Sequence, residues 1–210
     1  MKDYFEIDNF ITNDDYDIVE KNSTKVESFI DPNGAFKGME SAKQQWFDET
    51  TELGKLIISK FNKIEVLRDN KIDGMQVADM LKPYDVHGDY LVQKNQKPIS
   101  DPTIHDPMYT IIIPLVDGEY HTVVFDQTAD YNNFSNYKEK NTELAEYVPD
   151  EDWQKYCGHC YAVDQKYLTI KKVLHWRKGS LLALNRRCFH ASANFLKPKR
   201  AIVLWSSKSN

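Results

Sequence analysis

Tyr84-Asp85-Val86-His87-Gly88-Asp89-Tyr90-Leu91 is the stretch around which the chain is organised. It follows residues 75–81, in which apolar and polar side chains alternate, a pattern that predicts a half-buried strand. His87 and Asp89 are two positions apart, and on an extended backbone two such side chains point to the same face. One imidazole and one carboxylate can therefore reach a single metal ion together.

A metal ion held in this way needs a third ligand, and His190 is the best candidate. It follows Gly179, Ser180 and the apolar residues 181–184, which predict a tight turn and a buried strand, so its side chain can project into the mouth of a barrel. The other candidates are His121, His159 and His175. His175 has Arg186 eleven positions on, but it lies inside a strand flanked by Lys and Arg and ranks second. Two imidazoles and one carboxylate form a ligand set for Fe(II) that leaves coordination positions open.

Arg200 stands ten positions after His190 and precedes the apolar run Ala201-Ile202-Val203-Leu204-Trp205, which predicts a strand. A guanidinium at this place needs an anionic partner if it is buried, because a buried unpaired charge costs free energy. A carboxylate that accepts hydrogen bonds through both oxygens would satisfy it. The plain alternative is an arginine at the end of a strand, in water.

Many short strands and few helices predict a mainly β fold with flanking α-helices, a double-stranded β-helix (jelly roll, cupin-like). The strongest strand is predicted at residues 108–116, followed by a hairpin turn at Asp117-Gly118 and a returning strand at 119–125. Helices are expected within residues 12–63, flanking the sheet, and another strand at 64–68. The expected helix starts are Thr12 with Asp15, Ser41 with Gln44, and Thr51.

One domain is expected to span residues 1–210. Residues 126–165 are rich in Asn, Asp, Tyr, Lys and Glu, and a short helix is predicted from Pro149 through Tyr156. We interpret this segment as an insertion between strands, and long insertions are often lids or binding loops.

The composition favours a soluble, cytoplasmic protein. No apolar run approaches the roughly 20 residues of a membrane helix, and the first residues lack the pattern of a signal peptide. The three cysteines argue against a disulfide framework. The pair in Cys157-Gly158-His159-Cys160 cannot complete a four-ligand zinc site without partners from elsewhere in the chain. The net charge is −5, yet no Asp or Glu follows Asp164, and such a basic segment could attract nucleic acid or a small dianion.

Taken together, His87-x-Asp89, His190 and Arg200 resemble the Fe(II)/2-oxoglutarate-dependent oxygenase family. The opening Phe5-Glu6-Ile7-Asp8-Asn9-Phe10-Ile11, residues 74–84 and residues 179–190 are similar to segments of its prolyl-hydroxylase-like branch. The resemblance covers most of residues 1–125 and 166–206, and the predicted insertion lies outside it.

The resemblance implies a role for each matched residue. The catalytic centre would hold Fe(II) through His87, Asp89 and His190. Arg200 would pair with the distal carboxylate of the cosubstrate 2-oxoglutarate, and Thr110 would face the same pocket. Tyr109 and Tyr84 are further candidates for binding the cosubstrate. Pro114 and Ile202 depart from the Tyr and the Ser or Thr that many members carry at the matching positions.

The activity that the resemblance implies is that of a dioxygenase, an oxidoreductase that hydroxylates an unidentified substrate and releases succinate and CO₂. The substrate would be a prolyl residue of a peptide or protein, or a small molecule. The alternative is a non-catalytic jelly-roll protein that binds a metal or ligand, and turnover of 2-oxoglutarate separates the two. Residues 205–210 lack the further Arg of the DNA-repair branch, so neither nucleic acid nor a membrane is expected as a partner.

Overall fold

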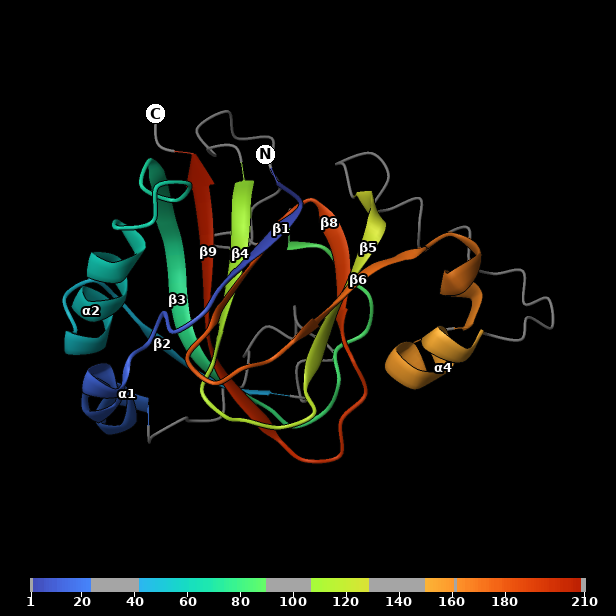
Figure 1. The fold of residues 1–210 in the computed structure, drawn as a ribbon, viewed down its shortest axis with the longest axis horizontal. Coiled ribbons are helices and arrows are strands. Elements are labelled where there is room, and N and C mark those ends of the chain that lie inside the picture. The colour runs from blue at the N-terminus through green and yellow to red at the C-terminus, as the bar shows by residue number, and fades with distance from the viewer. Residues whose placement is uncertain (1, 24–41, 90–106, 129–149, 161, 209–210) are drawn as a thin grey trace, which may run out of the picture.

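The structure is a computed structural model that describes residues 2–23, 42–89, 107–128, 150–160 and 162–208 (Figure 1). Its strands form two antiparallel sheets. The larger sheet has the order β1 (Tyr4–Ile7), β7 (Leu181–Asn185), β4 (Pro107–Pro114), β9 (Lys199–Lys208), β3 (Asn70–Met80) and β2 (Ala42–Phe47). The smaller sheet has the order β6 (Ile170–His175), β5 (His121–Thr128) and β8 (Cys188–Ser192).

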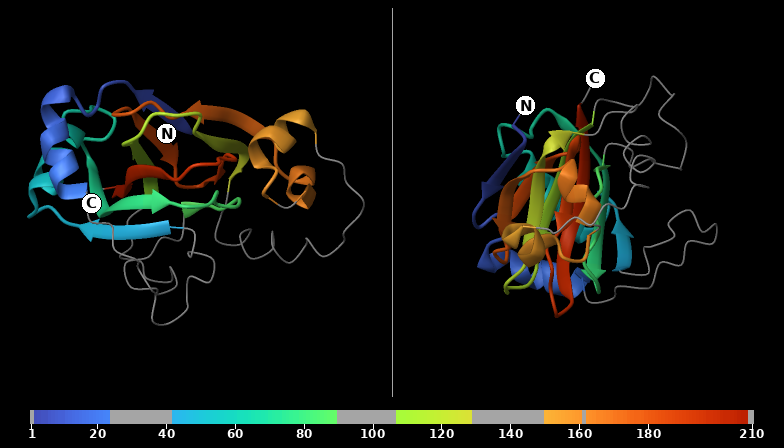
Figure 2. Two further views of the ribbon diagram at one scale, coloured as in Figure 1. Left: turned by 90° about the horizontal axis from the view of Figure 1, so that it is seen from below. Right: turned by 90° about the vertical axis from the view of Figure 1, so that its right-hand side faces the viewer.

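Helices cover the outer faces of the two sheets, which face each other (Figures 1 and 2). The first 3₁₀ helix η1 (Asn13–Asp15), α1 (Tyr16–Ser23) and α2 (Glu52–Phe61) lie on the side of the larger sheet. Helix α4 (Glu151–Cys157) and the 3₁₀ helix η5 (Ala162–Lys166) lie on the side of the smaller sheet. None of the described helices is long and apolar enough to cross a membrane. The predicted double-stranded β-helix with flanking helices is confirmed.

Successive side chains of strand β9 point alternately into two different hydrophobic layers. Ile202 and Leu204 pack with residues of α1 and α2, in the outer layer. Ala201, Val203 and Trp205 pack with Val124 and Leu174 of the smaller sheet, so they belong to the inner layer between the sheets. A third layer joins the smaller sheet to α4. Neighbouring residues of β9 therefore face different surroundings, which decides what each of them can bind.

Two of the predicted helix starts are confirmed. The Thr12 backbone N–H donates to Asp15 Oδ2 at 2.7 Å and Asp15 N–H donates to Thr12 O at 3.0 Å, before α1. Thr51 Oγ1 accepts a hydrogen bond from Gly54 N–H at 3.0 Å at the start of α2. These bonds satisfy backbone N–H groups that a helix start leaves without partners.

The helix expected from Ser41 and Gln44 is wrong, because residues 42–47 form strand β2. This strand pairs with β3 along its whole length, and the ring of Trp46 stacks on Trp205 with centroids 5.6 Å apart. The strand expected at residues 64–68 is also wrong. Leu67 N–H donates to Ile64 O at 2.9 Å, so the chain continues from α2 in turns, with Leu67 buried. In both places tertiary pairing and burial outweigh the local pattern.

The hairpin expected at Asp117-Gly118 is wrong as well, although both of its strands exist. Strand β4 has β7 on one edge and β9 on the other, so β5 cannot pair with it. The chain instead crosses to the smaller sheet after Gly118. The predicted helix in the insertion is confirmed as α4, where Asp150 Oδ1 accepts from Trp153 N–H at 2.8 Å. Most of the expected insertion, residues 129–149, lies outside the described residues.

Candidate metal centre

The two histidines of the centre are held together by their backbones. His87 follows β3 in the segment of residues 81–89, and His190 lies in β8. They form an isolated β-bridge in which each N–H donates to the other residue's carbonyl at 2.9 Å. The bridge places the segment beside β8, at an edge of the smaller sheet, and brings the two imidazole centroids to 4.3 Å.

Asp89 completes a group of three, because its carboxylate and the two imidazoles offer ligand atoms that all lie within 4.8 Å of one another. Asp89 Oδ2 is 3.5 Å from His190 Nε2, and both residues are buried. Thr110 Oγ1, on β4, donates to the same carboxylate oxygen at 2.5 Å. The buried Arg186, between β7 and β8, donates from Nε to the backbone carbonyl of Asp89 at 3.1 Å. The acid is thus held from two sides.

Both imidazoles are turned so that Nδ1 faces a backbone carbonyl and Nε2 is the nitrogen left for a metal ion. His87 Nδ1 lies 2.7 Å from the backbone carbonyl of Asp85, and His190 Nδ1 lies 3.2 Å from that of Cys188. A carbonyl accepts but cannot donate, so each Nδ1 carries the proton in the neutral ring. Each Nε2 is then the basic atom, as in most metal-binding histidines.

The three groups perturb one another's pKa values. Burial works against charge on all of them, but the imidazole of His190 outweighs it and holds the pKa of Asp89 below its usual range. Burial also opposes charge on His190, and the carboxylate of Asp89 more than compensates, so the pKa of His190 is raised. Burial and the neighbouring His190 lower the pKa of His87. A divalent cation at this place would take over the role that the His190 proton has beside Asp89.

The structure brings two of the four expected cosubstrate-binding residues to this centre. Thr110 contacts Asp89, and the ring of Tyr84 lies 5.9 Å from that of His87, centroid to centroid. Tyr109 belongs to the outer layer, where its ring meets Phe5 edge-on at 5.2 Å. Because successive side chains of β4 alternate, Tyr109 faces away from the pocket that Thr110 faces.

Arg200 also faces away from the centre, and its expected place in the pocket is corrected. It hydrogen-bonds both oxygens of Asp79 on the neighbouring strand β3, at 2.5 and 2.8 Å, and Nη1 donates to Ser23 O at 3.1 Å. Arg200 and Ile202 share the face of β9 that carries the helices. The anionic partner that the guanidinium requires is therefore a carboxylate of the protein itself.

Lys199, which the sequence reasoning missed, occupies the inner face instead. Its side chain is 1% exposed, and Nζ has no hydrogen-bonding partner among the described residues. Nζ lies 4.0 Å above the ring of Trp176, whose Nε1 donates to Thr122 Oγ1. Thr122 is two residues from Val124, the register partner of His190. Burial lowers the pKa of Lys199 to about 7.

The signal for Lys199 was present in the sequence. Lys199 precedes Arg200 and shares the parity of Ala201, Val203 and Trp205 on β9, whereas Arg200 has the opposite parity. Which parity faces the second sheet depends on how β9 lies between β4 and β3, and this is not readable from the run itself.

The other candidate ligands belong to two further groups. His121 and His175 lie together with Glu119, and His159 lies with Asp85 and Cys160. None of these histidines is in the group of His87, Asp89 and His190 within the part of the chain that the structure describes.

No protein-family model matches the sequence, and no curated protein sequence matches it. Solved structures do match. The viral collagen prolyl hydroxylase of Paramecium bursaria Chlorella virus-1, in complex with 2-oxoglutarate, superposes with a TM-score of 0.55 at 14% identity, covering 100% of this chain and 97% of that one. The non-haem α-ketoglutarate-dependent epimerase SnoN of nogalamycin biosynthesis has a TM-score of 0.59 at 11% identity, covering 98% and 78%.

HygX of Streptomyces hygroscopicus, with nickel, 2-oxoglutarate and hygromycin B bound, has a TM-score of 0.53 at 9% identity, covering 99% of this chain and 82% of HygX. At these identities the likeness concerns the fold. The chain has the double-stranded β-helix fold of 2-oxoglutarate- and Fe(II)-dependent oxygenases, and the predicted resemblance is confirmed at this level.

Proposed function

We propose that this protein is a dioxygenase dependent on Fe(II) and 2-oxoglutarate, with His87, Asp89 and His190 as its metal ligands. The observation that carries the proposal is this group of two imidazoles and one carboxylate on the inner face of the fold, in which Asp89 and His190 are buried and His87 is half-buried. This donor set suits Fe(II) and leaves positions open for a chelating cosubstrate and O₂. Both histidines already present Nε2, so the residues fit the metal without a change of tautomer.

We further propose that Lys199, in place of Arg200, receives the distal carboxylate of 2-oxoglutarate. A buried ammonium with no hydrogen-bonding partner among the described residues costs free energy, and an anionic ligand would provide both the hydrogen-bond acceptor and the opposite charge. Lys199 lies on the inner face, while Arg200 is already paired with Asp79 on the outer one. The keto acid end of 2-oxoglutarate is the end that chelates metals. The distal carboxylate is therefore the group left to pair with the Lys199 amine.

When bound, Fe(II) and 2-oxoglutarate supply the oxidising power for hydroxylating a C–H bond, with release of succinate and CO₂. The protein itself positions the metal ligands and excludes water from the site. Thr110 and Arg186 hold Asp89, and the backbone bridge holds His87 against His190. The walls of the inner layer are apolar and buried, among them Ile112, Leu182 and Val203.

We propose a peptide, in particular a prolyl residue, or a small molecule as the substrate. Both kinds of ligand occur among the structural neighbours: the viral enzyme is named a collagen prolyl hydroxylase, and HygX holds hygromycin B. We also propose that one oxygenase domain spans residues 1–210, since the match to the viral enzyme covers this whole length.

The test is anaerobic titration of the metal-free protein with Fe(II) and 2-oxoglutarate, in wild type and in His190→Ala. A visible charge-transfer band in the wild type that is absent from the variant supports the assigned ligands. Admitting O₂ should then convert 2-oxoglutarate to succinate. No band in the wild type refutes the proposal. A band without any succinate, with candidate peptides and small molecules present, would favour a non-catalytic binding protein.

A further inference from the structure

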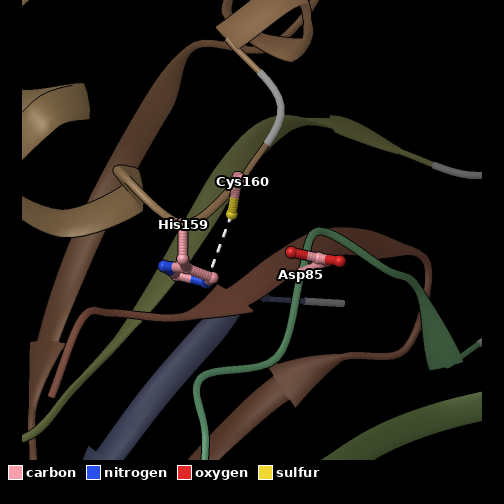
Figure 3. A group of neighbouring side chains, drawn as sticks. All are labelled: Asp85, His159 and Cys160. Atoms are coloured by element: carbon pink, nitrogen blue, oxygen red, sulfur yellow. Dashed lines mark hydrogen bonds between the residues drawn. The ribbon is translucent and has the colours of Figure 1, made fainter. Parts of the chain in front are cut away.

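Figure 3 shows a second group of metal-ligating side chains, which shares no residue with the centre described above. His159 and Cys160 come from the turn that ends α4, where Cys160 N–H donates to Cys157 O at 2.8 Å. Asp85 comes from the segment of residues 81–89, opposite this turn. Ligand atoms of Asp85, His159 and Cys160 all lie within 4.8 Å of one another. Only Cys160 of the Cys-x-x-Cys pair belongs to this group, together with its neighbour His159 and with Asp85 from a distant segment.

We propose that Asp85, His159 and Cys160 bind one divalent cation of the zinc type, through a carboxylate oxygen, Nε2 and Sγ. Thiolate, imidazole and carboxylate are the ligands that Zn²⁺ takes in proteins, and three of them leave the fourth tetrahedral position to water. His159 Nε2 and Cys160 Sγ are 3.3 Å apart. Ordinary Zn–N and Zn–S bond lengths at a tetrahedral angle separate these atoms by about 3.5 Å, so the pair needs only a small adjustment.

The second nitrogen of His159 is oriented as metal-binding histidines require. His159 Nδ1 lies 2.7 Å from Asn194 Oδ1. The Asn194 amide is fixed in this orientation, because its Nδ2 donates to the carbonyls of Gln154 and Lys155 at 3.3 and 3.1 Å. Nδ1 therefore donates, and Nε2 is the nitrogen that faces Cys160. This is the outer hydrogen bond that usually accompanies a histidine ligand.

The candidate ligand atoms of His159 and Cys160 also contact other groups of the protein. His159 Nε2 is 3.0 Å from the carbonyl of Tyr84, so both ring nitrogens face acceptors. Burial lowers the pKa of His159, but its contacts with Cys160, Tyr84 O and Asn194 outweigh this and raise it to about 9. Contact with Cys157 and burial raise the pKa of the Cys160 thiol. A cation bound here would replace the protons on Nε2 and Sγ, which would be released to solvent, because metals bind the deprotonated forms of these groups.

A cation here would brace the segment that carries His87. Asp85 would bind through its side chain, while its backbone carbonyl contacts His87 Nδ1 at 2.7 Å. The preceding residue, Tyr84, contacts His159 through its backbone carbonyl, and its ring lies edge-on to the ring of His87. The site therefore connects α4 to the first histidine of the metal centre. It shares no ligand with that centre, so the two sites can be tested separately.

The experiment is titration of the reduced, metal-free protein with Co²⁺, which replaces Zn²⁺ and reports thiolate ligands by a charge-transfer band in the near ultraviolet. We expect this band in the wild type and in His190→Ala, and its loss in Cys160→Ser. Cys188→Ser is the matched control, because Cys188 is also buried and lies two residues from His190. Asp85→Asn should weaken Co²⁺ binding at this band about tenfold or more, and excess Zn²⁺ should abolish the band.

Three outcomes would overturn the proposal: no thiolate band in the reduced wild type, a band that survives in Cys160→Ser, or a band that disappears in Cys188→Ser. Circular dichroism checks that each variant folds. If Cys160→Ser does not fold, Asp85→Asn decides, since Asp85 is exposed and its replacement does not disturb the core. Unchanged Co²⁺ affinity in that variant would then refute the site. Because His190→Ala removes the other metal centre, these results do not depend on the proposed oxygenase activity.

Discussion

Lys199→Met separates binding of the cosubstrate from stability, because the two should move in opposite directions. A hydrogen bond between charged groups contributes about 1.5–3 kcal/mol. If Lys199 receives the distal carboxylate, its loss should raise the dissociation constant of 2-oxoglutarate about 10- to 150-fold. Methionine keeps an unbranched apolar side chain but has no ammonium group, so packing on Trp176 is largely kept.

The same variant should be more stable without 2-oxoglutarate. Burial lowers the pKa of Lys199 from 10.5 to about 7. Between pH 7 and pH 10.5 Lys199 is protonated in the unfolded chain and neutral in the folded chain, so the free energy of unfolding rises with pH across this range. Below about pH 7 the folded chain carries the buried charge, and its full cost is present. At 1.36 kcal/mol per pKa unit the cost reaches about 5 kcal/mol. The Trp176 face and local relaxation recover part of it, so we expect Lys199→Met to raise the free energy of unfolding by about 1–4 kcal/mol.

The assays are anaerobic calorimetric titration of the Fe(II)-loaded protein with 2-oxoglutarate, and urea unfolding at pH 6.5 followed by circular dichroism. Arg200→Gln is the matched control, since it removes a neighbouring cation on the outer face. It should leave the affinity for 2-oxoglutarate within about twofold and lower the stability by about 1 kcal/mol through the lost pair with Asp79. Wild-type affinity in Lys199→Met, together with weakened binding in Arg200→Gln, would refute the assignment and return the role to Arg200.

Three further predictions concern the neighbours of the metal centre and its pH dependence. Thr110→Val removes the hydroxyl that donates to Asp89, and should weaken Fe(II) binding about 10- to 100-fold while Thr110→Ser binds like wild type; equal affinities would show that the hydroxyl has no such part. Pairing with 2-oxoglutarate should raise the pKa of Lys199 above the value of about 7 that it has without ligand, so binding takes up a proton above pH 7. The dissociation constant of 2-oxoglutarate should then rise up to about tenfold per pH unit above pH 7. A dissociation constant that does not change with pH in the wild type, or the same slope in Lys199→Arg, would contradict this. Arg186→Gln breaks the ion pair between the buried guanidinium and the half-buried Asp73, and also the bond to Asp89 O. It should lower the free energy of unfolding in urea by about 3 kcal/mol, whereas a loss below about 1 kcal/mol would mean that the pair is dispensable.

Capping and turn patterns predicted local features well where nothing distant competed. The starts of η1 at Thr12 and of α2 at Thr51 depend on hydrogen bonds within a few residues, and both were predicted. Ser41 and Gln44 carry a similar capping pattern, yet pairing with β3 makes residues 42–47 a strand. Asp117-Gly118 is a good hairpin signal, but both edges of β4 are already occupied. A local pattern cannot report whether a neighbouring edge is free.

By itself the sequence determined the type of fold and the pairing of His87 with Asp89 as candidate ligands. The spacing of His87 and Asp89 places both side chains on one face of an extended segment whatever the fold, and alternating apolar residues specify a β-rich core. Tertiary structure alone decided how these parts meet. The bridge between His87 and His190 joins residues about a hundred positions apart, and selects His190 over the other histidines. The packing of β9 between β4 and β3 turns Lys199 inward and Arg200 outward. Both depend on which surfaces face each other after folding, a property of the whole chain that no short stretch of it contains.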